Sequence, residues 1–354
     1  MGLVAFTLGG GCSKKKEPAP AGDKAGGSTQ AAEAGSGSGS GSGSARSAAA
    51  AAEGTTDPKL VARGEYVTSL FGCGVCHMGM GPHGPDPARA FAGGLEVPER
   101  GETWRSPNIT PDKGTGIGSW TDEQIIAAFR EGVRPDGSQL YVSMPYTNYN
   151  RMTDDDARAV VAYLRTVPPV ENVVSPNKLK TPKVAMPKPA NLPDDVNDPM
   201  KHGEYLVTMM HCNLCHMTLT KTGPDMEHAG GGGIPFNFPF MGTGTLYAKN
   251  ISSDPETGIG TWSTDDIAKA VKTMTRPDGS VIQGPMQFYL AGWSKLEDRD
   301  LQAIATYVKA MPAVKNKVPE STFKPLQGPP PGEGSGSGSP DIGVGGSHRT
   351  RTRR

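Results

Sequence analysis

The chain has 354 residues, and its 36 basic and 36 acidic side chains give a formal net charge of zero. This balance offers no electrostatic reason to expect nucleic-acid binding, and the length suggests two domains. Glycine and proline, at 48 and 32 residues, concentrate near both ends and around a central joint. Beyond a short run at the N-terminus, no stretch is apolar for long enough to suggest a span across a bilayer.

The N-terminal residues resemble a bacterial lipoprotein signal, because a short apolar run and small residues precede Cys12. We therefore expect residues 1–12 to be a lipoprotein signal, with Cys12 as the lipidated residue. The following residues, 13–56, include a Gly-Ser repeat at 35–44 that cannot bury apolar surface. They are predicted to form a low-complexity, flexible tether.

Three helices are predicted in the next part of the chain. Each begins at a residue type that caps helix N-termini: Asp57, which precedes Pro58, then Thr121 and Thr153. The last of them carries apolar residues at helical spacing and should end before Pro168, because proline cannot continue a helix. No alternating strand pattern competes with these helices.

The chain then repeats itself. The segment 64–67 recurs as 203–206, and the longer string 107–120, with its Asn-Ile, Thr-Gly-Ile-Gly and Trp, recurs as 249–262. The numbering offset drifts only from 139 to 144 along the two copies, so the insertions between them are small.

Two domains of one all-α fold are therefore predicted. The first repeat covers residues 57–172 and the second repeat covers residues 200–320, with a Pro- and Lys-rich linker at 173–199 between them. Residues 321–354 are rich in Pro, Gly and Ser and end in several arginines, so they are predicted to be a disordered tail.

Each repeat contains the motif C-x-x-C-H, at Cys73-Gly-Val-Cys76-His77 and at Cys212-Asn-Leu-Cys215-His216. This motif is the attachment site of a c-type haem. Two intervening residues separate the thiols enough to bond two vinyl groups of the porphyrin, and the adjacent histidine is brought under the iron. The motifs predict two c-type haems, attached to Cys73, Cys76, Cys212 and Cys215, with His77 and His216 as axial ligands of the iron.

Two other uses of paired cysteines have less support. A zinc site could take the four motif thiolates as its ligands, but both motif histidines would then have no role, and the motifs lie in separate repeats. A thioredoxin-like dithiol would need a strand–helix–strand context, and no strand-rich segment surrounds either motif.

The other axial ligand can be sought among the 15 methionines by comparing the repeats. Met144 and Met286 occupy matching positions, in loops before the last helix of each repeat, and are predicted to be the second axial ligands, with core packing as the alternative. Met241 and Met274 are the substitutes if Met286 is not a ligand, and a bis-histidine haem is a further alternative. Met152 is expected to belong to the core.

Several other residues recur or flank the motifs. Trp120 and Arg134 of the first repeat match Trp262 and Arg276 of the second. An arginine fork suits a carboxylate, so these four residues are candidates for contacts with haem propionates, with ordinary structural packing as the alternative. His211, directly before the second motif, is expected to pack beside the porphyrin rather than to bind the iron.

These features resemble class I cytochrome c, in which a helix ends in the haem motif and a final helix ends at proline. The string that begins at Asn108 and the Met-Pro-Tyr at 144–146 resemble more narrowly the cytochrome c subunits of membrane-bound bacterial alcohol and aldehyde dehydrogenases. The resemblance covers about residues 57–320. It implies two tandem class I cytochrome c domains, each a small all-α fold around one covalently bound haem. Those subunits commonly carry three haems, whereas this chain has two motifs.

The expected function is electron transfer. Two haems with histidine and methionine ligands are typical of an electron carrier, whereas a haem enzyme needs an open or unusual position on one iron. The donor would be a dehydrogenase or a quinol-oxidising complex, and the acceptor an oxidase or a small cytochrome. The alternative is an enzyme, either a dihaem cytochrome c peroxidase or a thiosulfate-oxidising protein. A haem-based sensor would be expected to carry a further signalling domain.

The compartment follows from the attachment chemistry. Haem is attached to paired thiols on the outer side of the bacterial inner membrane, so an exported protein is expected. With a lipid on Cys12, the protein should lie on the periplasmic side of the cell envelope. It would be bound to a membrane by this anchor, with its haem domains held away from the bilayer by the tether.

Overall fold

The structure is a computed structural model, and it describes residues 57–325 except 82–83, 100–101, 179, 181–183, 222 and 238–240. All of these residues belong to one compact unit, Ser47–Arg354. The predicted lipoprotein signal with Cys12, the tether and the part of the tail after residue 325 lie outside the described residues.

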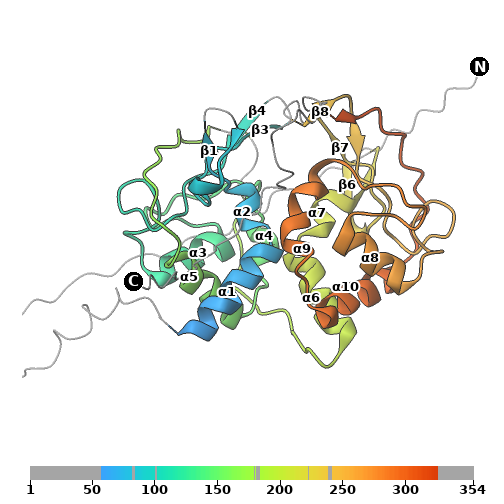
Figure 1. The fold of residues 1–354 in the computed structure, drawn as a ribbon, viewed down its shortest axis with the longest axis horizontal. Helices are drawn as coiled ribbons and strands as arrows, with labels where there is room; N and C mark the ends of the chain where they lie inside the picture. The colour runs from blue at the N-terminus through green and yellow to red at the C-terminus, as the bar shows by residue number, and fades with distance from the viewer. Residues whose placement is uncertain are drawn as a thin grey trace, which may run out of the picture. The chain divides into compact units, whose positions relative to one another are not determined.

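Among the described residues, five α-helices follow one another in the same order in each repeat (Figure 1), whereas the one 3-10 helix of each repeat lies at a different place. The first repeat has α1 (Pro58–Leu70), α2 (Cys73–Cys76), the 3-10 helix η1 (Pro87–Arg89), α3 (Asp122–Glu131), α4 (Tyr146–Tyr149) and α5 (Asp154–Leu164). The second repeat has α6 (Pro199–Met209), α7 (Cys212–His216), α8 (Thr264–Thr273), the 3-10 helix η2 (Gly284–Tyr289), α9 (Leu290–Trp293) and α10 (Asp298–Ala310).

The predicted helix starts are confirmed by capping hydrogen bonds. The Asp57 carboxylate accepts a bond from the Lys59 amide at 2.9 Å, and Thr121 forms a capping box with Gln124 at the start of α3. Each such bond satisfies an amide that would otherwise have no partner at the helix end. Side-chain caps of the same kind begin α5, α6 and α8, at Thr153, Asp198 and Ser263.

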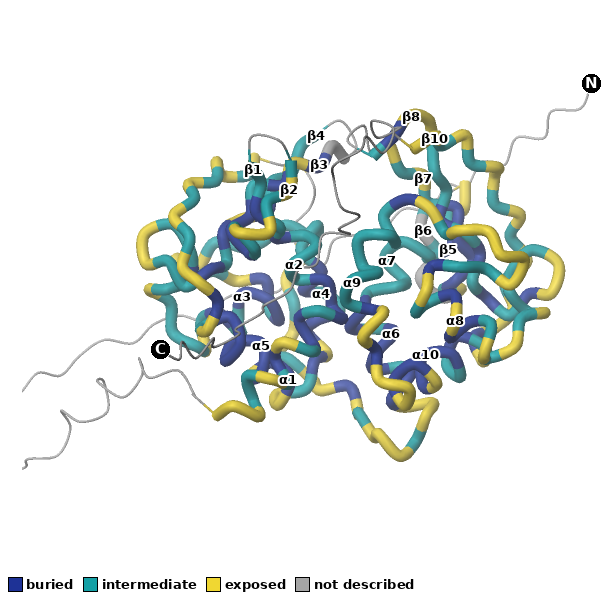
Figure 2. Tube along the Cα trace, viewed as in Figure 1, coloured by how far each residue is buried: buried dark blue, intermediate teal, exposed yellow. Residues whose placement is uncertain are grey.

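In each repeat the helix that leads into the haem motif packs against the last helix, α1 against α5 and α6 against α10 (Figure 1). The helices are so close that a β-carbon at Gly64 would overlap the carbonyl of Ala159, and one at Gly203 would overlap that of Ala303. This close approach explains why glycine recurs at both positions. Figure 2 shows buried residues along these helices. Val67, Leu70, Val161, Leu206, Met209 and Ile304, which belong to them, are at most 2% exposed.

The all-α prediction is incomplete, because the described residues also form five two-stranded antiparallel ribbons. In the first repeat β1 (Met80–Gly81) pairs with β2 (Gly84–Pro85), and β3 (Glu96–Glu99) pairs with β4 (Glu102–Arg105). In the second repeat β5 (Met217–Thr220) pairs with β6 (Gly223–Ala229), β7 (Pro235–Phe236) with β9 (Leu246–Tyr247), and β8 (Gly242–Thr243) with β10 (Lys324–Pro325). Most of these strands are too short to show the alternation of polarity that predicts a strand.

The linker is bound to the first repeat at several points along its length. The Asn177 side chain accepts a bond from the Arg105 amide at 2.6 Å and donates one to its carbonyl at 2.8 Å. The Val184 amide donates to the Tyr146 hydroxyl at 3.1 Å, and Leu192 is only 4% exposed. The described parts of the linker thus pack against the first repeat at these points.

Two predicted boundaries shift slightly. Helix α6 begins at Pro199, one residue inside the predicted linker, because Asp198 caps it and proline suits the first helical position. The predicted tail begins at residue 321, but β10 pairs with β8, and the Thr322 amide donates to the Thr245 carbonyl at 2.9 Å. Residues 321–325 therefore belong to the second repeat.

The two repeats meet through reciprocal hydrogen bonds. The Tyr66 hydroxyl of the first repeat donates to Asp300 of the second at 2.8 Å, and the Tyr205 hydroxyl of the second donates to Asp156 of the first at 2.6 Å. Both tyrosines belong to the recurring Gly-Glu-Tyr segment, and both aspartates lie in the first turn of the last helix. Helix α9 also packs on α1, and α4 on α6. The same surface of each repeat is used, as in a two-fold dimer.

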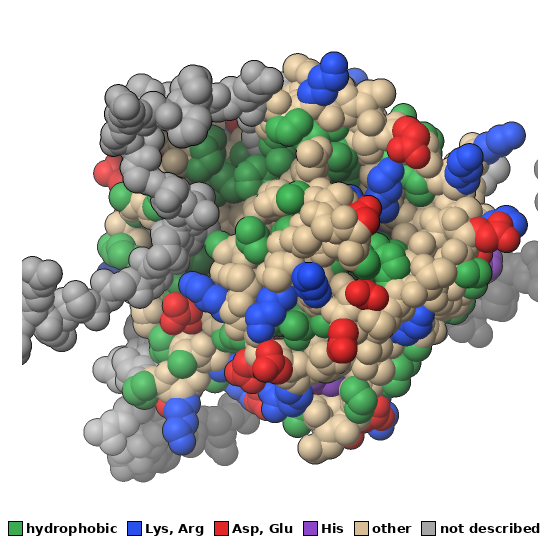
Figure 3. All heavy atoms as spheres, turned by 45° about the vertical axis from the view of Figure 1, so that its right-hand side comes forward, with side chains coloured by type: hydrophobic (Ala, Val, Ile, Leu, Met, Phe, Trp, Pro, Cys, Tyr) green, Lys and Arg blue, Asp and Glu red, His purple; other side chains and the backbone are tan. Residues whose placement is uncertain are grey.

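No helix in the described ranges is both long and apolar enough to cross a membrane. Figure 3 shows acidic and basic side chains interspersed over the face that it presents. This mixing agrees with the equal numbers of the two charges in the sequence.

Candidate haem sites

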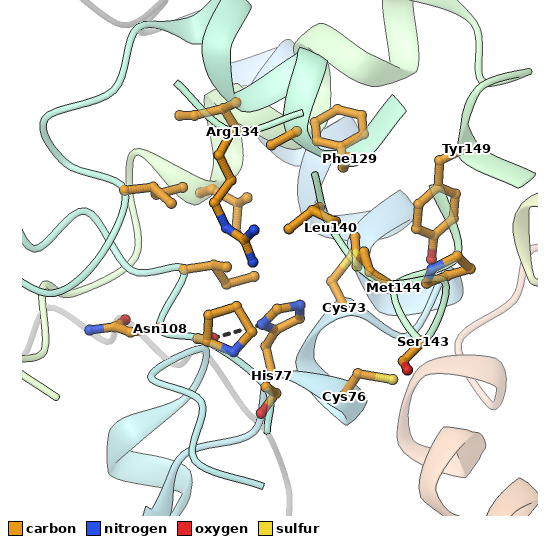
Figure 4. Close-up of a pocket in the computed structure, with 18 of the residues that line it drawn as sticks. Cys73, Cys76, His77, Asn108, Phe129, Arg134, Leu140, Ser143, Met144 and Tyr149 are labelled. Carbon is orange, nitrogen blue, oxygen red and sulfur yellow. Dashed lines mark hydrogen bonds between the residues drawn. The ribbon is translucent and has the colours of Figure 1, made fainter. Parts of the chain in front are cut away.

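A cavity of about 250 Å³ in the first repeat brings together most of the predicted site residues of that repeat. Its lining includes Cys73, Cys76, His77 and Met144, and Figure 4 shows His77 and Met144 pointing into it from different segments of the chain. Most of the remaining lining is apolar, with Phe71, Ile117, Ile125, Phe129, Leu140, Val160 and Leu164 among the side chains. These walls suit a flat, largely apolar group.

The first motif forms a single helical turn. The chain reverses at Gly72, whose φ of 75° is in the left-handed region, and then forms α2. The His77 amide donates to the Cys73 carbonyl at 2.9 Å and closes this turn. Residues three apart lie on one face of a helix, so Cys73 and Cys76 present their thiols to the same side.

Each motif histidine has one ring nitrogen held by a backbone carbonyl. His77 Nδ1 lies 2.8 Å from the Pro107 carbonyl oxygen, and His216 Nδ1 lies 2.7 Å from that of Lys249. A carbonyl only accepts, so Nδ1 carries the proton and Nε2 keeps its lone pair. Burial also lowers the pKa of both histidines, against the opposing effect of these bonds, and favours the neutral imidazole that binds metals. A metal-bound histidine is commonly oriented by this second bond.

A recurring asparagine fixes the loop that supplies each carbonyl. In the first repeat the Asn108 side chain donates to the Val170 carbonyl at 2.7 Å and accepts from the Thr110 amide at 2.9 Å. In the second repeat Asn250 donates to the Val314 carbonyl at 2.8 Å and accepts from the Ser252 amide at 2.9 Å, in the same arrangement. The recurrence of Asn-Ile marked these positions in the sequence, but not their role in orienting the motif histidine.

Burial raises the pKa of three motif cysteines. Burial, with a smaller effect of Cys76, raises the pKa of Cys73 to about 12, and burial raises the pKa of Cys76 to about 11. Burial likewise raises the pKa of Cys212 to about 12. Among the described residues, no three His, Cys, Asp or Glu side chains are grouped so that they could hold a metal ion. The four motif cysteines are therefore not gathered as a zinc site.

The residues of the first cavity fit a c-type haem. Two thiols on one face of a helical turn, an imidazole with a free Nε2 and a thioether all border the same apolar cavity. Cys73 and Cys76 would hold the porphyrin, and His77 would bind its iron. Met144 is half-buried and Met152, only 2% exposed, also borders the cavity. The axial role of Met144 stays a prediction.

In the second repeat Met286 lies in η2, half-buried against the core. Of its two predicted substitutes, Met241 lies beside Gly284 and Gln287 at a small surface pocket. Met274 is 1% exposed and has a left-handed φ of 52°, at the position where the first repeat has Gly132 with a φ of 71°. The axial role of Met286 also stays a prediction.

The candidate propionate residues have matching local geometry. Arg134 and Trp120 both border the first cavity, and Figure 4 shows the Arg134 guanidinium pointing into it. Its Nη1 lies 3.3 Å from the Ser138 hydroxyl, and Arg276 Nη1 lies 3.1 Å from that of Ser280. Trp262 is half-buried against the core of the second repeat. Each arginine is thus held by its own Asp-Gly turn, and the propionate contacts stay predictions.

A cytochrome c family model matches residues 61–168 of this chain. The chain is 37% identical over 280 residues to the cytochrome c subunit of a quinone-dependent alcohol dehydrogenase from Gluconobacter oxydans, and this match covers 73% of the chain and 56% of that protein. It is 33% identical over 281 residues to the fructose dehydrogenase cytochrome subunit of Gluconobacter japonicus, with 72% and 53% covered.

A third relative is matched over almost all of its own length. The chain is 31% identical over 282 residues to a dihaem cytochrome c-type protein of Cereibacter sphaeroides, with 73% of this chain and 91% of that protein covered. By contrast, the chain spans little more than half the length of the dehydrogenase subunits. The haem motif, the cavity that borders it and this match agree with the family predicted from the sequence, and the chain belongs to the c-type cytochromes.

Proposed function

We propose that this protein is a dihaem c-type cytochrome that carries electrons in a dehydrogenase-linked chain. It consists of two tandem class I cytochrome c domains, which are the first and second repeats, each around one haem. The observation that carries the proposal is the pair of histidine–carbonyl bonds, His77 to Pro107 and His216 to Lys249, at matching positions of two C-x-x-C-H motifs. Both imidazoles are oriented to offer Nε2 to an iron.

The haem iron, when bound, supplies the one-electron chemistry. The chain holds the porphyrin through its paired cysteines, orients the histidine through a backbone carbonyl and excludes water with apolar side chains. Met144 and Met286 are proposed to close the other axial position. Two closed, six-coordinate irons suit an electron carrier, whereas a peroxidase or a thiosulfate-oxidising enzyme needs an open or unusual axial position.

The proposed donor is a dehydrogenase. Relatives named as cytochrome subunits of alcohol, fructose and gluconate dehydrogenases match more than 70% of this chain, and this supports the partnership. A quinol-oxidising complex is the other candidate donor, and an oxidase or a small cytochrome the acceptor. Co-purification of the native protein with its neighbours tests the partnership directly.

We further propose that the protein is exported and lies on the periplasmic side of the bacterial cell envelope, anchored by a lipid on Cys12. The support is the chemistry of haem attachment and the small residues before Cys12. Cys12→Ser should release a soluble, haem-loaded protein from the membrane fraction. A variant that stays membrane-bound would show that the anchor is elsewhere.

The haem content and spin state test the central proposal. The purified protein should contain two covalently bound haems per chain, and its ferric spectrum should be low-spin with a methionine–iron charge-transfer band. One haem per chain would contradict the dihaem assignment. A high-spin haem that readily binds cyanide or peroxide would favour the enzyme alternative.

A further inference from the structure

Tyr289, the last residue of η2, belongs to the second repeat but lies at the junction between the two haem motifs. Its ring stacks on Trp293, with centroids 4.9 Å apart and planes at 28°. On another side it meets the ring of His211 edge-on at 6.0 Å. His211 directly precedes Cys212, so Tyr289 lies close to the second motif.

The same tyrosine also touches the first motif. Its ring fills the space beside Gly72, where a β-carbon would overlap Cε1 of the ring. The side chain of Tyr289 also lies near Cys76, where it opposes the rise in the pKa of that thiol. A residue of the second repeat therefore lies beside the first motif, both before Cys73 and near Cys76.

His211 completes this contact from the second motif. Its Nε2 lies 3.2 Å from the carbonyl oxygen of Phe71, its ring meets Tyr149 edge-on at 6.3 Å, and it borders the cavity of the first repeat. It has a φ of 45°, at the position where the first repeat has Gly72. A left-handed backbone is unfavourable for a residue with a side chain, so the surrounding contacts must hold His211 in place.

In the other direction, the first repeat contacts the second motif through a different residue, Tyr149, which meets His211. From Asn108 to Met144 the first repeat aligns residue for residue with Asn250 to Met286, and two extra residues then follow Met286 before the last helix. Tyr289 lies in this longer segment, at the end of η2. The rest of the junction is reciprocal, as the bonds of Tyr66 and Tyr205 show. The longer segment thus adds Tyr289, a residue of the second repeat, to the surroundings of the first haem motif.

We propose that Tyr289 is a positioning residue for the first haem, supplied by the second repeat, and that Tyr289 and His211 form a wall shared by the two haem sites. The inference rests on the proposed function, because it requires a haem in both repeats. After attachment the Cys76 sulfur would be a thioether, which is a weak acceptor for a nearby hydroxyl such as that of Tyr289. Hydrogen bonding and exclusion of water both influence the reduction potential of a haem. The second repeat would thereby tune the first haem.

The test compares two substitutions in the full-length, haem-loaded protein. Tyr289→Phe removes only the hydroxyl, and Tyr289→Leu also removes the ring. The control is Tyr307→Phe, in α10 of the same repeat. Both reduction potentials are measured by spectroelectrochemical titration, and a Cys73→Ser/Cys76→Ser variant, which lacks the first attachment site, identifies the potential of the second haem.

Tyr289→Phe should shift the potential of the first haem more than that of the second, because the hydroxyl acts on Cys76 of the first motif. Tyr289→Leu should shift both potentials, because the ring contacts Gly72 beside the first motif and His211 beside the second. Potentials equal to those of Tyr307→Phe, or a shift confined to the second haem, would overturn the inference. If Tyr289→Leu does not accumulate, Tyr289→Phe decides alone. A single haem in the unmodified protein would instead contradict the proposed function, so the two failures are distinguishable.

Discussion

The Nε2 atom of His202 lies 2.9 Å from a carboxylate oxygen of Asp300, which is fully buried. The other ring nitrogen, Nδ1, lies 2.6 Å from a carboxylate oxygen of Asp194 in the linker. A carboxylate accepts hydrogen bonds, and a neutral imidazole has only one N–H to donate. Both bonds can form together only if His202 is a charged imidazolium. The first repeat has Arg63, which is always charged, at the matching position beside Asp156.

This arrangement predicts a pH-dependent stability. Burial by itself lowers the pKa of His202, but the bonds to Asp194 and Asp300 outweigh it and raise the pKa to about 9. The stabilisation is fully present below the unfolded-state pKa of about 6.5 and is lost as the pH rises through the folded-state value. The free energy of unfolding should therefore decline across that interval, as measured by urea titration at several pH values.

The control for this prediction is the exposed His228. His202→Leu should remove the decline, whereas His228→Gln should retain it. The contribution of Asp300 to stability should instead be lost at low pH. Burial raises its pKa, but the bonds to His202 and Tyr66 outweigh burial and lower it, so its contribution is lost only in acid. An unchanged decline in His202→Leu would show that another group titrates.

The reciprocal tyrosine–aspartate bonds should stabilise the junction. Tyr66→Phe and Tyr205→Phe each remove a donor from a buried carboxylate, and each should reduce the free energy of unfolding by about 1–3 kcal/mol. Tyr307→Phe, which makes none of these bonds, should cost much less. Chemical denaturation measures the three variants. If both junction variants match the control, these bonds contribute little to holding the repeats together.

Two substitutions can distinguish the predicted axial ligand, Met144, from Met152, which borders the same cavity. Met144→Ala should convert the first haem to a high-spin or water-ligated form and lower its potential, because the iron loses a thioether donor. Covalent attachment should persist, since both cysteines remain. Met152→Ala should cost about 2–5 kcal/mol of stability without changing the ligation. Optical spectra and redox titration measure both effects.

Met286→Ala should convert only the second haem to a high-spin or water-ligated form and lower only its potential. If Met144→Ala leaves both haem spectra unaltered, the first repeat uses another ligand, and matching the repeats does not identify it.

Gly64 of α1 faces α5, and a side chain at this position should lower the stability of the protein. Gly64→Ala places a methyl group against the carbonyl of Ala159, and overpacking of this kind costs about 1–3 kcal/mol. Gly203→Ala should cost a similar amount against Ala303. Gly114→Ala is the control, because a β-carbon there would make only an ordinary contact. Thermal unfolding followed by circular dichroism compares the three, and equal melting temperatures would refute the packing argument.

The helical turn of each haem motif and the helix starts could be predicted from the sequence because each depends on residues close together in the chain. Two cysteines three positions apart and an adjacent histidine form one helical turn, and a cap such as Thr121 bonds within three residues of itself. The repeated string around Asn108 was visible too. The role of this string in orienting His77 could not be predicted, because the Pro107 carbonyl that it positions meets a histidine 30 residues away in the sequence.

The junction was decided by the tertiary structure. Tyr66 reaches Asp300 across 234 residues, and Tyr289 packs against Gly72 from the opposite repeat. A linker rich in proline is compatible with separate or packed domains, so composition alone leaves their arrangement open. Pairings of this kind depend on the shape and polarity of two folded surfaces, and neither leaves a periodic pattern along the chain. The sequence by itself determined the chemistry of each haem motif, and only the packing of one repeat on the other determined which residues the two motifs share.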